Sequence, residues 1–169
     1  FLTLFCDTDE AMGMNMVTIA AQAVGEWIEK EIDGLTLVTV AANVDSDKKP
    51  SVRTHDEGRG YEVRAEVVLL SSVITEVLKT TPEKMLDVAR AKLEVGSALA
   101  GAIGKNLHAA NMIAAIFVAT GQDPAHVVEG SLADTTVEDH KDGILVSVRL
   151  PAVMIGLRGG GTDLPAQKK

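Results

Sequence analysis

The sequence has one cysteine, no long hydrophobic run and a shortage of positive charge. Cys6 alone cannot form a disulfide within the chain, and it fits a reducing compartment. The longest apolar run, residues 112–120, is far shorter than the roughly 20 residues that span a bilayer. The formal net charge is −8, so the surface repels nucleic-acid phosphates. We therefore expect a cytoplasmic protein with no nucleic-acid partner and no membrane segment in this stretch.

The sequence does contain enough apolar material for a packed core. Of its 169 residues, 46% are hydrophobic and 24% are charged, which suits one ordinary domain or a piece of a larger protein. The chain starts at Phe1 and runs directly into an apolar stretch, without the basic start and cleavage site of a signal peptide. We expect a segment of a longer polypeptide.

Hydrophobic periodicity predicts a mixture of helices and strands. Strands are predicted at residues 1–6, 35–44, 62–70 and 143–155, and helices at 11–32, 71–80, 82–93, 95–120 and after Pro124. The segment 95–120 is rich in Gly and Ala and is predicted to be a long central helix with closely packed neighbours. Because helices and strands do not alternate regularly, the expected fold class is α+β.

A charged loop at residues 44–52 contains Asp47-Lys48-Lys49-Pro50. A lysine ammonium is a compact charge that can stabilise a developing oxyanion. Pro50 biases Lys49 toward an extended backbone, so the two lysines are expected to point apart. One could serve chemistry while the other binds a substrate carboxylate or an ion-pair partner. Judged locally, a solvated turn is the favoured interpretation.

Two glycine-containing turns are candidate anion sites. In EAMGMNM (residues 10–16), Gly13 would let a ligand approach the N–H groups of a helix start, although a methionine-rich core helix is the simpler interpretation. In EGRGYE (57–62), Arg59 stands between two glycines and could bind phosphate, or the segment could be a plain hairpin turn.

Polar residues in the second half have similar alternatives. His108 and Asn111 are three apart on the predicted long helix and would share a face, either at a site or as a buried structural pair. Asp123 precedes Pro124 and would cap a helix, or it could be a carboxylate that tunes an active-site lysine. The glycine turn at 159–162 could cradle phosphate or be an ordinary loop.

Taken in order, these motifs resemble those of the 3-hydroxy-3-methylglutaryl-coenzyme A (HMG-CoA) reductases. The resemblance covers essentially all 169 residues and includes EAMGMNM, DKKP, EGRG, GSALAGAIG, HAAN, GQD and GGGTDLPAQ. The first two are similar to the class that uses NADPH. The resemblance implies two hydride transfers that convert HMG-CoA to mevalonate, with release of coenzyme A. It also implies at least a homodimer, with the active site between subunits.

The resemblance assigns regions and residues. Residues 1–36 would end a small ferredoxin-like cofactor domain, 37–61 would form a connecting strand and active-site loop, and 62–169 would be part of the large substrate domain. Lys48 would stabilise the oxyanion, with Asp123 beside it in the proton network. The residues expected around the hydroxymethylglutaryl group are Asp47, Lys49, Lys92, His108 and Asn111. Those expected to contact NADPH are Glu10, Met12, Gly13, Met14, Asn15, Met16, Arg59, Gly159 and Gly160. No metal is expected.

The sequence also departs from the family pattern. Ala41-Ala42-Asn43 stands where the family has Ser-Gly-Asn, and Asp9-Glu10 where it has Gly-Asp. The GAIGKNLHAAN stretch is one residue shorter. The family's catalytic glutamate and histidine are expected before Phe1 and after Lys169. These departures motivate an alternative, a non-catalytic paralogue or fragment that binds coenzyme A or a dinucleotide.

Overall fold

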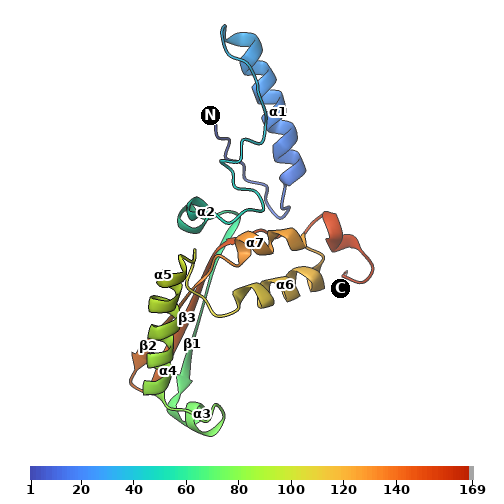
Figure 1. Cartoon of the computed structure of the whole chain (residues 1–169). Coiled ribbons are helices and arrows are strands. Elements are labelled where there is room, and N and C mark those ends of the chain that lie inside the picture. The colour runs from blue at the N-terminus through green and yellow to red at the C-terminus, as the bar shows by residue number, and fades with distance from the viewer. Residues whose placement is uncertain (168–169) are drawn as a thin grey trace.

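A three-stranded antiparallel sheet runs through the larger part of the molecule (Figure 1). Its strands are β1 (Tyr61–Leu70), β2 (Asp134–His140) and β3 (Gly143–Val153), in the order β1-β3-β2. The central strand β3 pairs with both others, so Val146 lies opposite Val67 and Val137. The computed structural model describes residues 1–167, and its helices and small antiparallel sheet confirm the α+β class.

Helical segments occupy much of the remaining chain. They are α1 (Met14–Glu31), α2 (Val52–Glu57), α3 (Ser71–Glu76), α4 (Pro82–Ala89), the π-helical η1 (Arg90–Gly96), α5 (Ser97–Ala100), α6 (Ala109–Thr120), the 3₁₀ turn η2 (Pro124–His126), α7 (Val127–Gly130) and η3 (Gly160–Asp163). The consecutive segments α4, η1 and α5 form one helical column beside the sheet, while α1 stands away from it (Figure 1). No helix among residues 1–167 has the length and apolar character needed to cross a membrane.

A small apolar cluster fixes the helices that later matter for the site. Ile113 and Phe117 of α6 pack against Val153 of β3, and all three are buried. Val127 at the start of α7 packs on the same cluster. The short turn η2, which connects α6 to α7, is therefore held at the end of the sheet.

Several elements begin and end where the sequence predicts. Thr81 accepts a hydrogen bond from the Lys84 N–H with Pro82 at the first helical position, and Gly121 ends α6 in the left-handed conformation. The predictions of the strands at 62–70 and 143–155 and of the helix at 11–32 are confirmed.

The prediction of one long helix over 95–120 is wrong. Gly101 ends α5 with φ of 63°, residues 101–108 form a loop, and α6 starts only after His108. Hydrogen bonds to β2 and to the residues just before it hold this loop: the Thr135 N–H of β2 donates to the carbonyl of Lys105, and the Asn106 amide donates to the carbonyls of Ser131 and Ala133. These tertiary bonds replace the helical ones that the composition favours.

The strands predicted at 1–6 and 35–44 are also absent among the described residues, and both segments are mostly exposed. A strand needs a neighbour to pair with, and here residues 35–44 instead run past α1, where the side chain of Leu37 lies against Gly25. Conversely, the structure contains one strand, β2, that was not predicted from the sequence. The Asp142-Gly143 pair after it is a hairpin signal that could have revealed it.

The loop at 101–108 yields a stability prediction. Gly104 has φ of 80°, and a Cβ there would lie 2.7 Å from the carbonyl oxygen of Ala133. Gly104→Ala should therefore lower the free energy of unfolding by about 2–3 kcal/mol. Gly101→Ala is the matched control, because Gly101 also has positive φ but nothing lies within 4 Å of its Cβ position. It should cost only about 1 kcal/mol. Urea unfolding of the full-length protein measures both, and equal costs would contradict the close-approach argument.

His55 connects α2 to β2. Its Nε2 lies 2.7 Å from Asp134 Oδ2, and its Nδ1 lies 2.8 Å from Asp56 Oδ1. Burial opposes the charged ring, but the hydrogen bonds to the two carboxylates outweigh burial and raise the pKa of His55. A raised histidine pKa means that the folded state binds the proton more tightly than the unfolded state.

This linkage predicts a pH-dependent contribution to stability. The contribution of His55 is fully present below its ordinary pKa of 6.5 and is lost as pH rises through the raised value. His55→Gln should cost about 1–2 kcal/mol at pH 5.5 and progressively less toward pH 8.5. Thermal midpoints of the two proteins across this range measure the difference, with His140→Gln as the control. A gap that does not change with pH would count against the linkage.

Candidate functional site

The structure brings Lys48 and Asp123 together. Lys48 Nζ lies 3.0 Å from Asp123 Oδ2, although the residues are far apart in the sequence. Their side chains are 41% and 38% exposed, so the pair lies at the surface of the site and not in the core. The expected proximity of these two residues is confirmed.

Asp123 has two tasks, divided between its two oxygens. Oδ1 accepts the N–H of Ala125 at 2.9 Å, which caps the turn η2 before Pro124. Oδ2 remains available for Lys48. Both interpretations of Asp123, helix cap and lysine partner, therefore hold in the same structure.

The pair is ionised over a wide pH range. The hydrogen bond to Asp123 raises the pKa of Lys48 above its ordinary value, against some burial. The Ala125 N–H and then the Lys48 ammonium lower the pKa of Asp123. Near neutral pH the site therefore presents a full positive charge beside a full negative charge. Such an ammonium can donate a hydrogen bond to an oxygen that gains negative charge.

Behind this pair lies an inner cluster of charges. Arg59 Nη1 donates to Asp47 Oδ1 at 2.9 Å and to Glu129 Oε1 at 2.8 Å. Glu129 is completely buried, and the same oxygen accepts the backbone N–H of Lys48 at 2.5 Å. Although burial opposes its charge, the neighbouring His126 ring and the backbone N–H of Lys48 lower the pKa of Glu129.

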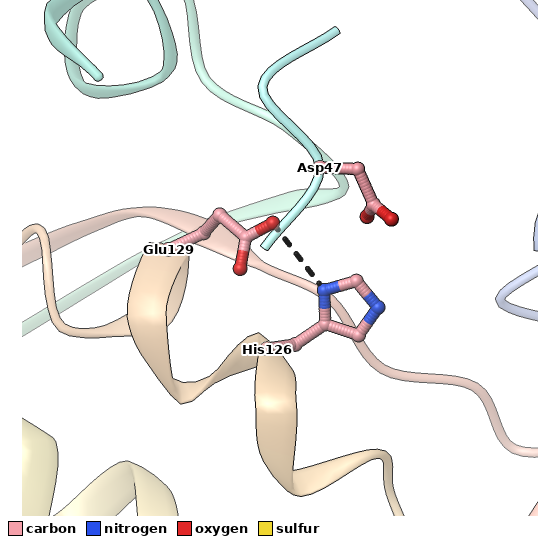
Figure 2. Close-up of side chains that lie close together, drawn as sticks. All are labelled: Asp47, His126 and Glu129. Carbon is pink, nitrogen blue, oxygen red and sulfur yellow. Dashed lines mark ion pairs between the residues drawn. The ribbon is translucent and has the colours of Figure 1, made fainter. Parts of the chain in front are cut away.

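His126 fills the space between the two carboxylates of the short helical turn. Its Nδ1 lies 3.4 Å from Glu129 Oε1, and its Nε2 lies 3.9 Å from Asp123 Oδ2. Figure 2 shows the ring beside Glu129, with Asp47 on the neighbouring loop. Sequence reasoning missed both His126 and Glu129. The signal was their spacing of three and six residues after Asp123, in an otherwise apolar stretch.

A metal ion could in principle use the same cluster. Ligand atoms of Asp47, His126 and Glu129 all lie within 4.8 Å of one another. However, Arg59 already donates to both carboxylates, and Lys48 is adjacent. A divalent cation would have to compete with a guanidinium for the same oxygens, so the charge arrangement does not favour one.

The other residues predicted around the substrate are spread over separate elements. Lys49 Nζ donates to the carbonyl of Asp47 at 2.9 Å, so the two lysines have different partners, as expected. Lys92 is exposed on η1. The prediction that His108 and Asn111 share a face of one helix is wrong, because His108 precedes α6 and has φ of 62°. Within residues 1–167, no ion pair or hydrogen bond joins Lys92, His108 or Asn111 to the Lys48–Asp123 pair.

The two predicted cofactor segments lie side by side. Ala11 and Arg158 form a parallel β-bridge, and the Leu157 N–H donates to the carbonyl of Glu10 at 2.7 Å. The Glu10 carboxylate also pairs with Arg158 at 2.5 Å. This contact places the glycine turn of residues 159–160 near the methionine-rich turn, at opposite ends of the sequence. Both glycines are exposed.

The methionine-rich turn also approaches the charged cluster. Gly13 precedes α1 with φ of 77°, and Met14 is its first helical residue. Arg59 Nη2 lies 3.6 Å from Met14 Sδ. Met12 is partly buried, whereas Asn15 and Met16 are exposed. Arg59, predicted to approach the dinucleotide, is held here by Asp47 and Glu129.

An ammonium that is 41% exposed suits a site for an anionic, oxygen-rich ligand. Comparison with known proteins gives the family. The family model described as hydroxymethylglutaryl-coenzyme A reductase matches residues 1–169, so the chain belongs to this family.

Curated relatives agree with this assignment. The 3-hydroxy-3-methylglutaryl-coenzyme A reductase of Halobacterium salinarum is 46% identical over 100% of this chain and 42% of its own length. That of Methanocaldococcus jannaschii is 48% identical over 96% of this chain and 41% of its own. Reductase 1 of Dictyostelium discoideum is 44% identical over 99% of this chain and 31% of its own. The chain thus spans less than half the length of these relatives.

Proposed function

We propose that the polypeptide containing this chain reduces HMG-CoA to mevalonate with two equivalents of NADPH, in isoprenoid precursor synthesis. The observation that carries the proposal is the ion pair of Lys48 and Asp123 at 3.0 Å. Family membership supplies the reaction, and the pair supplies the charge that this reaction needs. The acidic composition and the single cysteine support a cytoplasmic location.

Lys48 would act on the carbonyl oxygen of the thioester. When the carbonyl carbon is reduced, this oxygen gains negative charge, and the ammonium can donate a hydrogen bond to it. Asp123 keeps Lys48 protonated and oriented, since its Oδ2 accepts from Nζ. The same pair can stabilise the alkoxide formed from the aldehyde in the second reduction and return a proton to it.

The paired turns of residues 10–16 and 159–160 would hold the nicotinamide nucleotide, which supplies the hydrides when bound. Their fit rests on exposed glycine backbone and on the methionine-rich helix start, which can meet an anionic diphosphate. A cavity of about 250 Å³ beside the first of these turns is lined by Thr8, Met12, Gly60 and Tyr61, among others. Glu10 and Arg158 would fix the relative position of the two turns.

Substrate contacts are proposed for Asp47, Lys49, Lys92, His108 and Asn111. Lys49 and Lys92 are exposed cations that could meet the free carboxylate of the substrate. Because Lys92, His108 and Asn111 lie on other elements than the Lys48 loop, we propose that the complete site forms between two subunits. We also propose the division into a small cofactor domain ending at residue 36, a connecting region at 37–61 and a large-domain part at 62–169. The last two residues of that part lie outside those described.

A ferredoxin-like small domain would also explain the two segments that lack strand partners. Residues 1–6 and 35–44 flank α1 in the sequence and have strand-like composition. In such a domain they would pair with strands supplied by other parts of the polypeptide. The apolar side chains of α1, including the 60% exposed Trp27, would then be covered.

The activity proposal is tested at Lys48. Lys48→Ala in the full-length protein should lower kcat for NADPH oxidation with HMG-CoA by about 100- to 1000-fold, because an oxyanion donor is lost. Lys48→Arg should recover little, since a planar guanidinium does not replace a compact ammonium. Lys49→Ala is the matched control and should change mainly KM. A wild-type protein that binds coenzyme A or NADPH without turnover would favour the non-catalytic alternative, and an unaffected kcat in Lys48→Ala would refute the assigned role.

The dimer is a separate prediction. Analytical ultracentrifugation of the full-length protein should show a species of at least twice the chain mass at micromolar concentration. The reason is that Lys92 and His108, proposed to contact the substrate, lie on other elements than the Lys48 loop, so the complete site is expected to take residues from two subunits. A monomer at all concentrations that still turns over HMG-CoA would contradict a site shared between subunits.

A further inference from the structure

We propose that Glu129 is a positioning residue for Lys48, which it orients through the backbone N–H of that lysine. The inference rests on the proposed reductase function, because it concerns the same ammonium. Glu129 belongs to α7 and is 0% exposed, yet its Oε1 accepts the Lys48 N–H at 2.5 Å. A charged oxygen is thus buried where it meets the backbone of the residue proposed to act on the substrate.

The turn at Lys48 needs an external support. Lys48 has φ of 55°, in the left-handed region that non-glycine residues rarely adopt, and Ser46 and Asn43 of the same loop have φ of 53° and 60°. Each such residue costs about 1 kcal/mol or more. Within the loop, the Ser46 and Lys49 N–H groups donate to the carbonyls of Asn43 and Ser46. The bond to Glu129 connects this strained turn to the rest of the fold.

Both ends of Lys48 are held by one short segment. Glu129 accepts from its backbone, and Asp123 accepts from its ammonium. The two carboxylates are six residues apart: Asp123 caps η2, which packs on α6, and Glu129 lies on α7, which packs on α6 and β3. Since backbone and side-chain tip are fixed to the same support, the ammonium has a defined direction, which is what pre-organised electrostatic stabilisation requires.

The buried carboxylate is itself stabilised by neighbouring groups. Arg59 Nη1 donates to Glu129 Oε1 at 2.8 Å and also binds Asp47, the residue before Lys48. His126 fills the adjacent space with Nδ1 at 3.4 Å. Because Arg59 binds both Asp47 of the loop and Glu129, it provides a second connection between the loop and Glu129, made through side chains.

The decisive comparison is Glu129→Ala against Glu129→Gln in the full-length protein. Alanine removes the acceptor, whereas glutamine keeps an oxygen that can accept the Lys48 N–H. We expect kcat to fall about 10- to 100-fold in Glu129→Ala and about 2- to 5-fold in Glu129→Gln, with KM for HMG-CoA nearly unchanged in both. Glu138→Ala, at an exposed carboxylate on β2, is the matched control and should retain wild-type kcat.

Amide hydrogen exchange supplies a readout that does not depend on turnover. The peptide covering residues 44–52 should exchange about tenfold faster in Glu129→Ala than in the wild type, while Glu129→Gln and peptides from β3 stay close to wild-type rates. Unchanged exchange of this peptide, or equal kcat in the alanine variant and the wild type, would overturn the proposal. A third result would also overturn it: Glu129→Gln exchanges faster throughout the chain, and its kcat is as low as that of Glu129→Ala. This pattern would mean that Glu129 only supports folding.

The two readouts also separate this inference from the proposed function. If the wild type is inactive but the 44–52 peptide still loses protection in Glu129→Ala, the reductase activity is refuted and the attachment of the loop is retained. If the wild type is active but the exchange of this peptide does not change in Glu129→Ala, the activity is retained and the attachment of the loop is refuted.

Discussion

The packing of α6 and α7 over the end of β3 is the constraint on which the rest of the site depends. Ile113, Phe117 and Val153 bury one another there, and this apolar contact fixes the turn between the two helices. Asp123 and Glu129 lie on that turn and on α7, so their carboxylates inherit a fixed position from the core. The Lys48 loop is mostly exposed, so its position depends on hydrogen bonds to these two acceptors.

Charge balance explains how so many ionisable groups can lie together. Three carboxylates, those of Asp47, Asp123 and Glu129, surround two permanent cations, Lys48 and Arg59. Glu129 would be costly to bury alone, and the hydrogen bonds that its Oε1 accepts from Arg59 and from the Lys48 backbone N–H offset part of that cost. Removing Arg59 would leave the buried Glu129 without a cationic hydrogen-bond donor, whereas removing Glu129 would leave Arg59 paired with Asp47 alone.

Local patterns predicted the parts of the fold whose causes are local. Thr81-Pro82, Asp123-Pro124 and Gly121 mark helix boundaries because capping involves only nearby atoms. The break at 101–108 could not be predicted in this way, since Asn106 and Lys105 make their hydrogen bonds with residues about 25 to 30 positions further on. The strand prediction for residues 35–44 is wrong for a related reason: strand propensity does not indicate whether a partner strand is present.

The site shows the same division more sharply. Asp123 was ambiguous in the sequence because a cap and a lysine partner seemed to be alternatives, but a carboxylate has two oxygens and here each performs one task. Arg59 likewise stands in a glycine turn and still reaches two acids. Glu129 was missed because its main contact is with the backbone of a residue 81 positions earlier, which its spacing from Asp123 does not reveal. Candidate side chains can therefore be inferred from their order and spacing, whereas contacts to a distant backbone, such as that of Glu129 with the Lys48 N–H, become apparent only when the fold is known.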